Sequence, residues 1–124
     1  MKNAKAQWIK ENIKEGEEYS GLILGKGGEP DYHLFLRPGE AESVTFEEAK
    51  AWAKKAGGEL PTRREQSLLF ANLKEQFQPR WYWSGEQCAP YDDYAWAQGV
   101  YDGVQNLCRK DDGCRARAVR RLPI

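Results

Sequence analysis

The chain has 124 residues, 40% hydrophobic and 31% charged, and its 19 basic and 19 acidic side chains give no net charge. This length fits one domain with a hydrophobic core. The even charge balance gives no reason to expect tight non-specific binding to nucleic acid or to an acidic membrane surface, so a nucleic-acid partner is not expected.

No apolar run reaches the roughly 20 residues that a membrane-spanning helix needs, and the start of the chain lacks the apolar segment of a signal peptide. The three cysteines, Cys88, Cys108 and Cys114, are typical of an intracellular chain with reduced thiols. We therefore expect a cytoplasmic protein without a membrane partner. Cys108 and Cys114 flank a turn, and a disulfide between them stays open as the less favoured alternative.

The N-terminal part of the chain predicts a helix followed by a β-hairpin. Residues 3–15 place apolar side chains at nearly helical spacing, and Gly16 ends this helix. Two β-prone runs, residues 19–25 and 32–37, flank a segment rich in turn-forming residues. On this basis we divide the chain into an N-terminal helical extension over residues 1–18 and a single domain over residues 19–124.

Two capping boxes predict the next two helices. Thr45 with Glu48 begins a helix over residues 46–56, and Thr62 with Glu65 begins a second one that ends before Pro79. Their expected buried stripes consist of Ala49, Trp52, Ala53 and Ala56 in the first helix, and of Leu68, Leu69, Ala71, Leu73 and Phe77 in the second. Residues 57–65, Gly-Gly-Glu-Leu-Pro-Thr-Arg-Arg-Glu, form a corner that joins them, and its composition needs no explanation beyond this joint.

The C-terminal half predicts an aromatic β region. Seven of the fifteen aromatic residues lie within residues 81–101, and four strands are expected, near residues 81–84, 94–98, 104–108 and 115–120. Trp81, Trp83 and Trp96 are interpreted as core. The whole pattern predicts an α+β fold, with two helices packed on a small twisted, mostly antiparallel sheet with long loops.

Five segments resemble a bacterial and phage family of C-type-lectin-like domains of unknown function, related to the C-terminal domain of a bacterial collagen-like adhesin. They are residues 44–53, 57–66, 81–86, 94–98 and 115–120. The resemblance covers residues 19–122 and implies a C-type-lectin-like fold, and short members of this kind are often encoded by phages or prophages. The Leu-Pro-Thr corner also occurs in the formylglycine-generating enzymes and in variable ligand-binding proteins diversified by retroelements, so the activity has to be argued from a site.

The sequence contains few residues that are candidates for catalysis. His33 is the single histidine and lies in a predicted strand, so we interpret it as structural or exposed. The cysteines lack the paired spacing of zinc sites, and Cys108 with Cys114 is the one thiol pair available for oxidase chemistry. We expect no catalytic residue and no cofactor.

Two acidic pairs, Asp92-Asp93 and Asp111-Asp112, offer oxygens to calcium, but adjacent aspartates are more often turn residues, and no metal site is expected. The arginines near the end of the chain could contact phosphate. We favour an exposed strand edge, with Arg115 and Arg117 on one face and Ala116 and Ala118 on the other.

The remaining candidate is a binding surface on the loops between residues 85 and 114, where tyrosines supply contact area at low entropy cost and acids and amides supply hydrogen bonds. The sequence therefore predicts a non-catalytic binding module, in its most concrete form a phage or prophage accessory protein that binds a host or virion protein. Carbohydrate or small-ligand binding is the alternative. The predicted site residues are Tyr91, Asp92, Tyr101, Asp102, Gln105 and Asn106.

Overall fold

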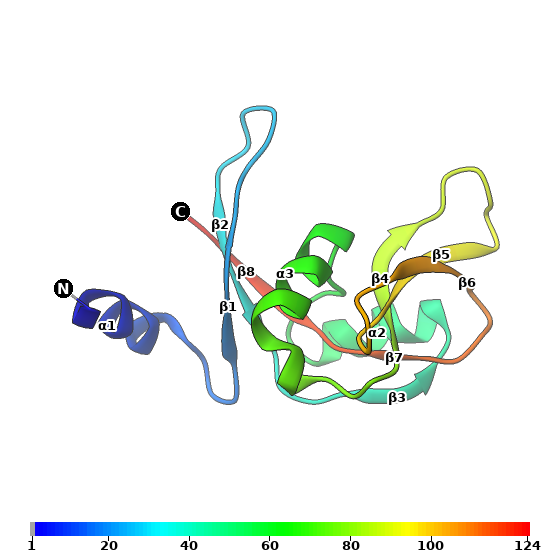
Figure 1. Cartoon of the computed structure of the whole chain (residues 1–124), viewed down its shortest axis with the longest axis horizontal. Coiled ribbons are helices and arrows are strands. Elements are labelled where there is room, and N and C mark those ends of the chain that lie inside the picture. The colour runs from blue at the N-terminus through cyan, green and yellow to red at the C-terminus, as the bar shows by residue number, and fades with distance from the viewer. Residues whose placement is uncertain (1) are drawn as a thin grey trace.

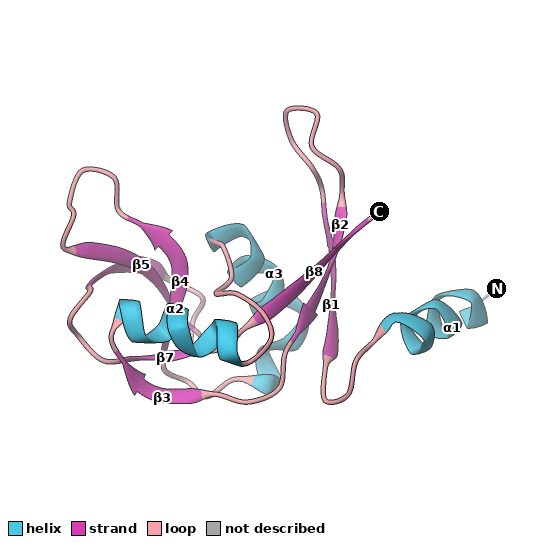
Figure 2. Ribbon diagram, turned by 180° about the vertical axis from the view of Figure 1, so that it is seen from behind, coloured by secondary structure: helices cyan, strands magenta, loops and turns pink. Residues whose placement is uncertain are grey.

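The computed structural model describes residues 2–124, which form an α+β fold with two sheets (Figures 1 and 2). The described helices are α1 (Lys2–Asn12), α2 (Phe46–Lys55), α3 (Arg63–Leu73) and the short 3-10 helix η1 (Lys74–Gln76). The strands are β1 (Glu18–Ile23), β2 (Tyr32–Leu36), β3 (Ala41–Val44), β4 (Trp81–Gln87), β5 (Tyr94–Gly99), β6 (Gln105–Arg109), β7 (Cys114–Ala116) and β8 (Val119–Pro123).

The smaller sheet has the order β1-β2-β8 and is antiparallel throughout, so the last strand returns to the first hairpin. One face is apolar and packs against α3, which lies between the two sheets in Figure 1. Leu69 and Leu73 of α3 meet Leu34, Leu36 and Val119 of the sheet in one buried cluster. Helix α3 is thus fixed by burial of apolar surface on this sheet.

The larger sheet has the order β3-β7-β4-β5-β6 and is antiparallel except where β4 runs parallel to β7. Helix α2 covers it and lies in front of β7 in Figure 2. Its buried residues, Phe46, Ala49 and Ala53, pack around Trp83, whose indole Nε1 donates to the carbonyl oxygen of Val44 at 2.8 Å. Alanines on both sides let the helix approach the sheet closely around this one large ring.

Both predicted capping boxes are confirmed. The Thr45 hydroxyl accepts from the Glu48 amide at 3.3 Å, and the Thr62 hydroxyl accepts from the Glu65 amide at 3.1 Å. Gly57, with φ at 88°, follows Ala56, the C-cap residue of α2, in a conformation that favours glycine. Ala71, expected on the buried stripe of α3, is exposed instead, because the helix turns Leu69 and Leu73 toward the small sheet.

The predicted N-terminal helix is present as α1 and contacts the small sheet through Trp8. The indole of Trp8 lies with its centroid 4.0 Å from the ring of His33, and the hydroxyl of Tyr19 is 2.8 Å from Nδ1 of the same histidine. Helix α1 is therefore held to the outer face of the sheet by an aromatic cluster.

The prediction of a single sheet is wrong. The closing strand divides into β7 and β8, which belong to two different sheets. Between them Arg117 turns inward, is 9% exposed, and donates to the carbonyl oxygens of Gln76 (2.6 Å) and Arg37 (3.0 Å). Burial lowers the pKa of Arg117. The first half of the segment joins the larger sheet and the second half joins the smaller one.

The prediction of an exposed edge of arginines is also wrong, since each arginine has a buried or half-buried acceptor far away in the sequence. Arg115 forms an ion pair with Glu40 at 2.5 Å. Arg120 donates two hydrogen bonds to the Glu17 carboxylate, at 2.8 and 2.9 Å. Ala116 and Ala118 are buried, as predicted.

Two further strand predictions need correction. Strand β4 continues through Gly85 to Gln87 across an irregularity in its pairing with β5, whereas the strand was expected near residues 81–84. Strand β3 was not predicted at all, because Ala-Glu-Ser-Val has little β pattern and becomes a strand through its pairing with β7. Trp81, expected in the core, is 39% exposed, whereas Trp83 is 0% exposed.

Across residues 2–124, no helix combines the length and the apolar composition needed to cross a bilayer.

Acid should weaken this fold through Glu17, which lies buried between Arg37 and Arg120. Burial alone would raise the pKa of Glu17, but hydrogen bonds from Arg120, the Lys14 amide and Arg37 outweigh it and lower the pKa to about 2 from its ordinary 4.5. As the pH falls, Glu17 of the unfolded chain therefore binds a proton before Glu17 of the folded protein does. The stabilisation from Glu17 is complete above pH 4.5 and is lost as the pH falls toward 2. Thermal unfolding of the protein and of Glu17→Gln between pH 7 and pH 2 should show a flatter decline below pH 4.5 in the variant; an equal decline would contradict this role.

Candidate binding site

The structure separates the predicted site residues into two groups at opposite ends of β5. Tyr91 and Asp92 lie in the loop between β4 and β5, while Tyr101 and Asp102 lie in the turn between β5 and β6. Strand β5 has six residues, which corresponds to roughly 20 Å. The two tyrosines therefore lie apart, at the two ends of this strand, and do not belong to one loop.

Gln105 and Asn106 belong to strand β6 and make hydrogen bonds within the domain. The Gln105 side-chain amide donates to the carbonyl oxygen of Arg63 at 2.8 Å, and its oxygen accepts from the Arg63 guanidinium at 3.2 Å. Oδ1 of Asn106 accepts from the backbone amide of Leu107 at 2.7 Å. Gln105 thus joins β6 to α3, which gives it a structural role that the sequence did not reveal.

Three exposed side chains lie at the turn after β5 and beside it at the start of β4. We call this surface the aromatic end and define it as Trp81, Tyr101 and Val104. All three are exposed, and Tyr101 has 74% of its surface in solvent. Trp81 lies over Gly99, where a side chain at position 99 would come within 3.3 Å of the indole. The aromatic end therefore projects apolar area from the sheet into solvent.

Short hydrogen bonds hold the turn of the aromatic end in place. The amide of Gly103 donates to the carbonyl oxygen of Gly99 at 2.7 Å, and the Asp102 carboxylate accepts from the Val104 amide at 3.1 Å. Gly103 has a φ of 83° and packs against the ring of Phe70, so a larger residue would not fit. Asp102 thus shapes the turn, and Tyr101 is left as its freely exposed member.

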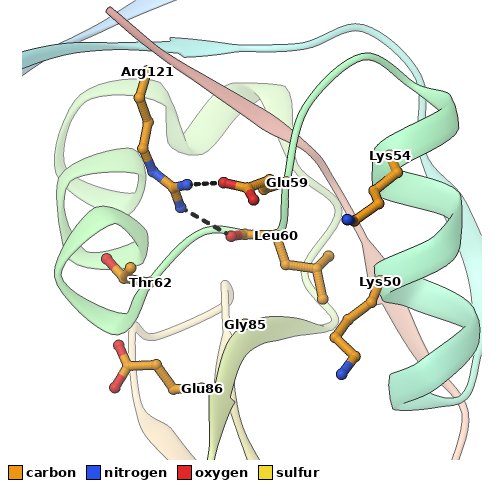
Figure 3. A pocket seen from close by; sticks show the side chains of 8 residues that line it. All are labelled: Lys50, Lys54, Glu59, Leu60, Thr62, Gly85, Glu86 and Arg121. Atoms are coloured by element: carbon orange, nitrogen blue, oxygen red, sulfur yellow. Dashed lines mark hydrogen bonds and ion pairs between the residues drawn. The ribbon is translucent and has the colours of Figure 1, made fainter. Parts of the chain in front are cut away.

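The joint between α2 and α3 is hollowed, although the sequence suggested only a connection there. A cavity of about 240 Å³ lies between α2 and the corner, and Figure 3 shows the side chains that line it. Lys50 and Lys54 come from α2, Thr62 and Leu60 from the corner, and Glu86 from β4. The sequence reasoning missed these lysines; their spacing of four residues on an exposed helix face was the one available signal.

An ion pair between the half-buried Arg121 and the buried Glu65 fixes one wall of this cavity. Arg121 donates to Glu65 at 2.7 and 2.9 Å, and also to Glu59 and to the carbonyl oxygen of Leu60. Burial would raise the pKa of Glu65, but its hydrogen bonds from Arg121 and Tyr32 outweigh burial and lower that pKa. Burial and the bond to Glu65 in turn raise the pKa of Tyr32 to about 12. The corner is thus held to β8 and β2 by one charged network.

The candidate catalytic side chains lie in different parts of the fold. His33 belongs to the small sheet and contacts Trp8 and Tyr19, whereas Cys108 and Cys114 belong to the larger sheet. All three cysteines are free thiols. A hydrogen bond between Cys108 and Cys114 lowers the pKa of Cys108 and, together with burial, raises that of Cys114. Within residues 2–124, His, Cys, Asp and Glu side chains form no cluster of three or more suited to a metal ion.

Compared with protein-family models and with curated proteins, the chain has no match.

Proposed function

We propose that this chain is a non-catalytic binding module that recognises a protein partner through the aromatic end. The observation that carries the proposal is Tyr101, an aromatic side chain with 74% of its surface exposed on a turn fixed by hydrogen bonds. Exposed aromatic residues on rigid supports are frequent hot spots of protein interfaces, because their large area is buried at low entropy cost. Trp81 and Val104 extend the same surface.

The fold family and the biological setting of the chain are part of the same proposal. The order of hairpin, helix, Leu-Pro-Thr corner, helix and aromatic sheet, on which the resemblance rests, supports a C-type-lectin-like fold. That resemblance also suggests a phage or prophage accessory protein that acts in the cytoplasm of the host or on the virion. A carbohydrate ligand stacked on Tyr101 is the alternative occupant of the same surface.

Replacing Tyr101 with alanine should weaken capture of the partner at least about 30-fold, the loss typical of a hot spot. The unfolding temperature should change little, since the side chain is exposed. Affinity for the captured protein would be measured by surface plasmon resonance after its identification by mass spectrometry.

Tyr91→Ala is the matched control, because Tyr91 is another exposed tyrosine at the far end of β5. It should bind as the unaltered protein does. If the Tyr101→Ala variant binds the partner as tightly as the unaltered protein does, the aromatic end is not the binding surface. Binding of a glycan in place of a protein would favour the alternative ligand.

A further inference from the structure

Two of the three cysteines lie on either side of one short turn, which joins β6 to β7. The amide of Asp112 donates to the carbonyl oxygen of Arg109 at 3.0 Å and closes this turn. The amide of Lys110 donates to the loop before β5 at 2.8 Å, and its carbonyl oxygen accepts from the first amide of α2 at 2.9 Å. The turn therefore holds Cys108, near the end of β6, and Cys114, at the start of β7, in fixed positions.

Both cysteine side chains face the core between α2 and the larger sheet. Cys108 lies opposite Ala95 of β5, and Cys114 lies opposite Val44 of β3. Directly opposite residues of antiparallel strands share one face of a sheet, and all four residues belong to the same core cluster or pack against it. A hydrogen bond joins the two thiols, so their sulfur atoms already lie next to each other.

The two thiols differ in exposure and in acidity. Cys108 is half-buried, whereas Cys114 is 7% exposed. The hydrogen bond with Cys114 lowers the pKa of Cys108, and the same bond together with burial raises the pKa of Cys114. The thiolate is the nucleophilic form of cysteine, and oxidation of sulfur follows thiolate character and access to solvent. Cys108 is therefore the better nucleophile of the pair.

From this geometry we propose that Cys108 and Cys114 are a redox-reactive pair, which hydrogen peroxide oxidises to a disulfide within the chain. The Cys108 thiolate attacks one peroxide oxygen and the O–O bond breaks, which leaves a sulfenic acid and a hydroxide ion. The Cys114 sulfur then attacks the Cys108 sulfur, so that the S–S bond forms as the S–O bond breaks and a second hydroxide leaves. The protons of the two thiols convert both hydroxides to water. The pair lies toward the far end of β6 from the aromatic end and does not depend on the proposed protein partner.

The test is treatment of the reduced protein with hydrogen peroxide, followed by denaturation, alkylation of the remaining thiols, digestion with trypsin and mass spectrometry. Trypsin cuts after Arg109 and Lys110, between the two cysteines, so a disulfide appears as two linked peptides. Linked peptides of Cys108 and Cys114 are expected from a protein that stays monomeric on a non-reducing gel, and dithiothreitol should separate them. Cys88, which is 4% exposed, should remain a thiol that alkylation labels.

Variants separate the roles of the two thiols. In Cys114→Ala the sulfenic acid of Cys108 has no thiol to react with, so it should be trapped by dimedone. In Cys108→Ala the Cys114 thiol should stay unoxidised. Cys88→Ala is the matched control and should give the linked peptides as the unaltered protein does. The absence of linked peptides from the unaltered protein would overturn the proposal whether or not the variants fold, as would a disulfide to Cys88 or one between two chains.

Discussion

Replacing Glu65 with alanine is expected to lower the free energy of unfolding by about 3–5 kcal/mol, the range for breaking a buried ion pair from one side. The Glu65 side chain is 0% exposed and accepts from Arg121, Tyr32 and the Thr62 amide. Its removal leaves the charge of Arg121 without its main partner and opens the capping box of α3. Urea unfolding followed by circular dichroism would measure the change.

Glu65→Gln is the matched control because it keeps the volume and the acceptor oxygen while removing the charge. Its loss of stability should be smaller than that of the alanine variant, since the amide oxygen can keep the bonds that Tyr32 and Arg121 Nε make to Oε2. The bonds that Arg121 Nη2 and the Thr62 amide make to Oε1 are lost, because the amide nitrogen is a donor. A loss below about 1 kcal/mol for Glu65→Ala would contradict the central place of this ion pair in the fold.

Replacing Trp83 with alanine should cost about 3–5 kcal/mol as well, here through a cavity in the core. The Trp83 ring packs edge-on to Phe46 with centroids 5.5 Å apart and is enclosed by alanines of α2 and of the larger sheet, which are too small to fill the space. The backbone carbonyl of Val44 also loses its donor.

Trp81→Ala tests the same residue type two positions earlier on the same strand. Because Trp81 is exposed and lies only over Gly99, its replacement should change the free energy of unfolding by about 1 kcal/mol or less. Urea midpoints of the two variants would check the contrast. Equal losses would mean that Trp81 carries as much of the core as Trp83 does.

Local patterns were sufficient to predict the helices of this fold. A capping box involves residues three positions apart, so Thr45 with Glu48 and Thr62 with Glu65 could be identified directly. Strand positions from aromatic and turn residues were also close, although strand ends shifted by one to three residues. The α+β class followed from these elements.

Long-range contacts explain what the sequence did not predict. Arg117 looks like any strand arginine until its acceptors, the carbonyl oxygens of Gln76 and Arg37, are brought to it from distant segments. Trp81 and Trp83 have the same local pattern, and only the position of α2 decides which one is buried. The corner cavity likewise needs Glu86 and Lys54, which lie on different elements.

The candidate site shows the same limit. Tyr101 was predicted as a site residue and lies exposed on a fixed turn, but its separation from Tyr91 depends on the hairpin between them. Gln105 was assigned to the predicted binding surface because amides supply hydrogen bonds there, whereas its bonds to Arg63 form only when α3 packs beside β6.

The most direct test of the proposed binding function is site-specific photocrosslinking. A photoreactive phenylalanine derivative would replace Tyr101 in one variant and Tyr91 in the other, and each would be irradiated with the identified partner protein. A crosslink at position 101 and none at position 91 is the predicted result, because only the aromatic end is expected to lie in the interface. A crosslink at position 91 alone, or at neither position while the partner is bound, would contradict the proposal.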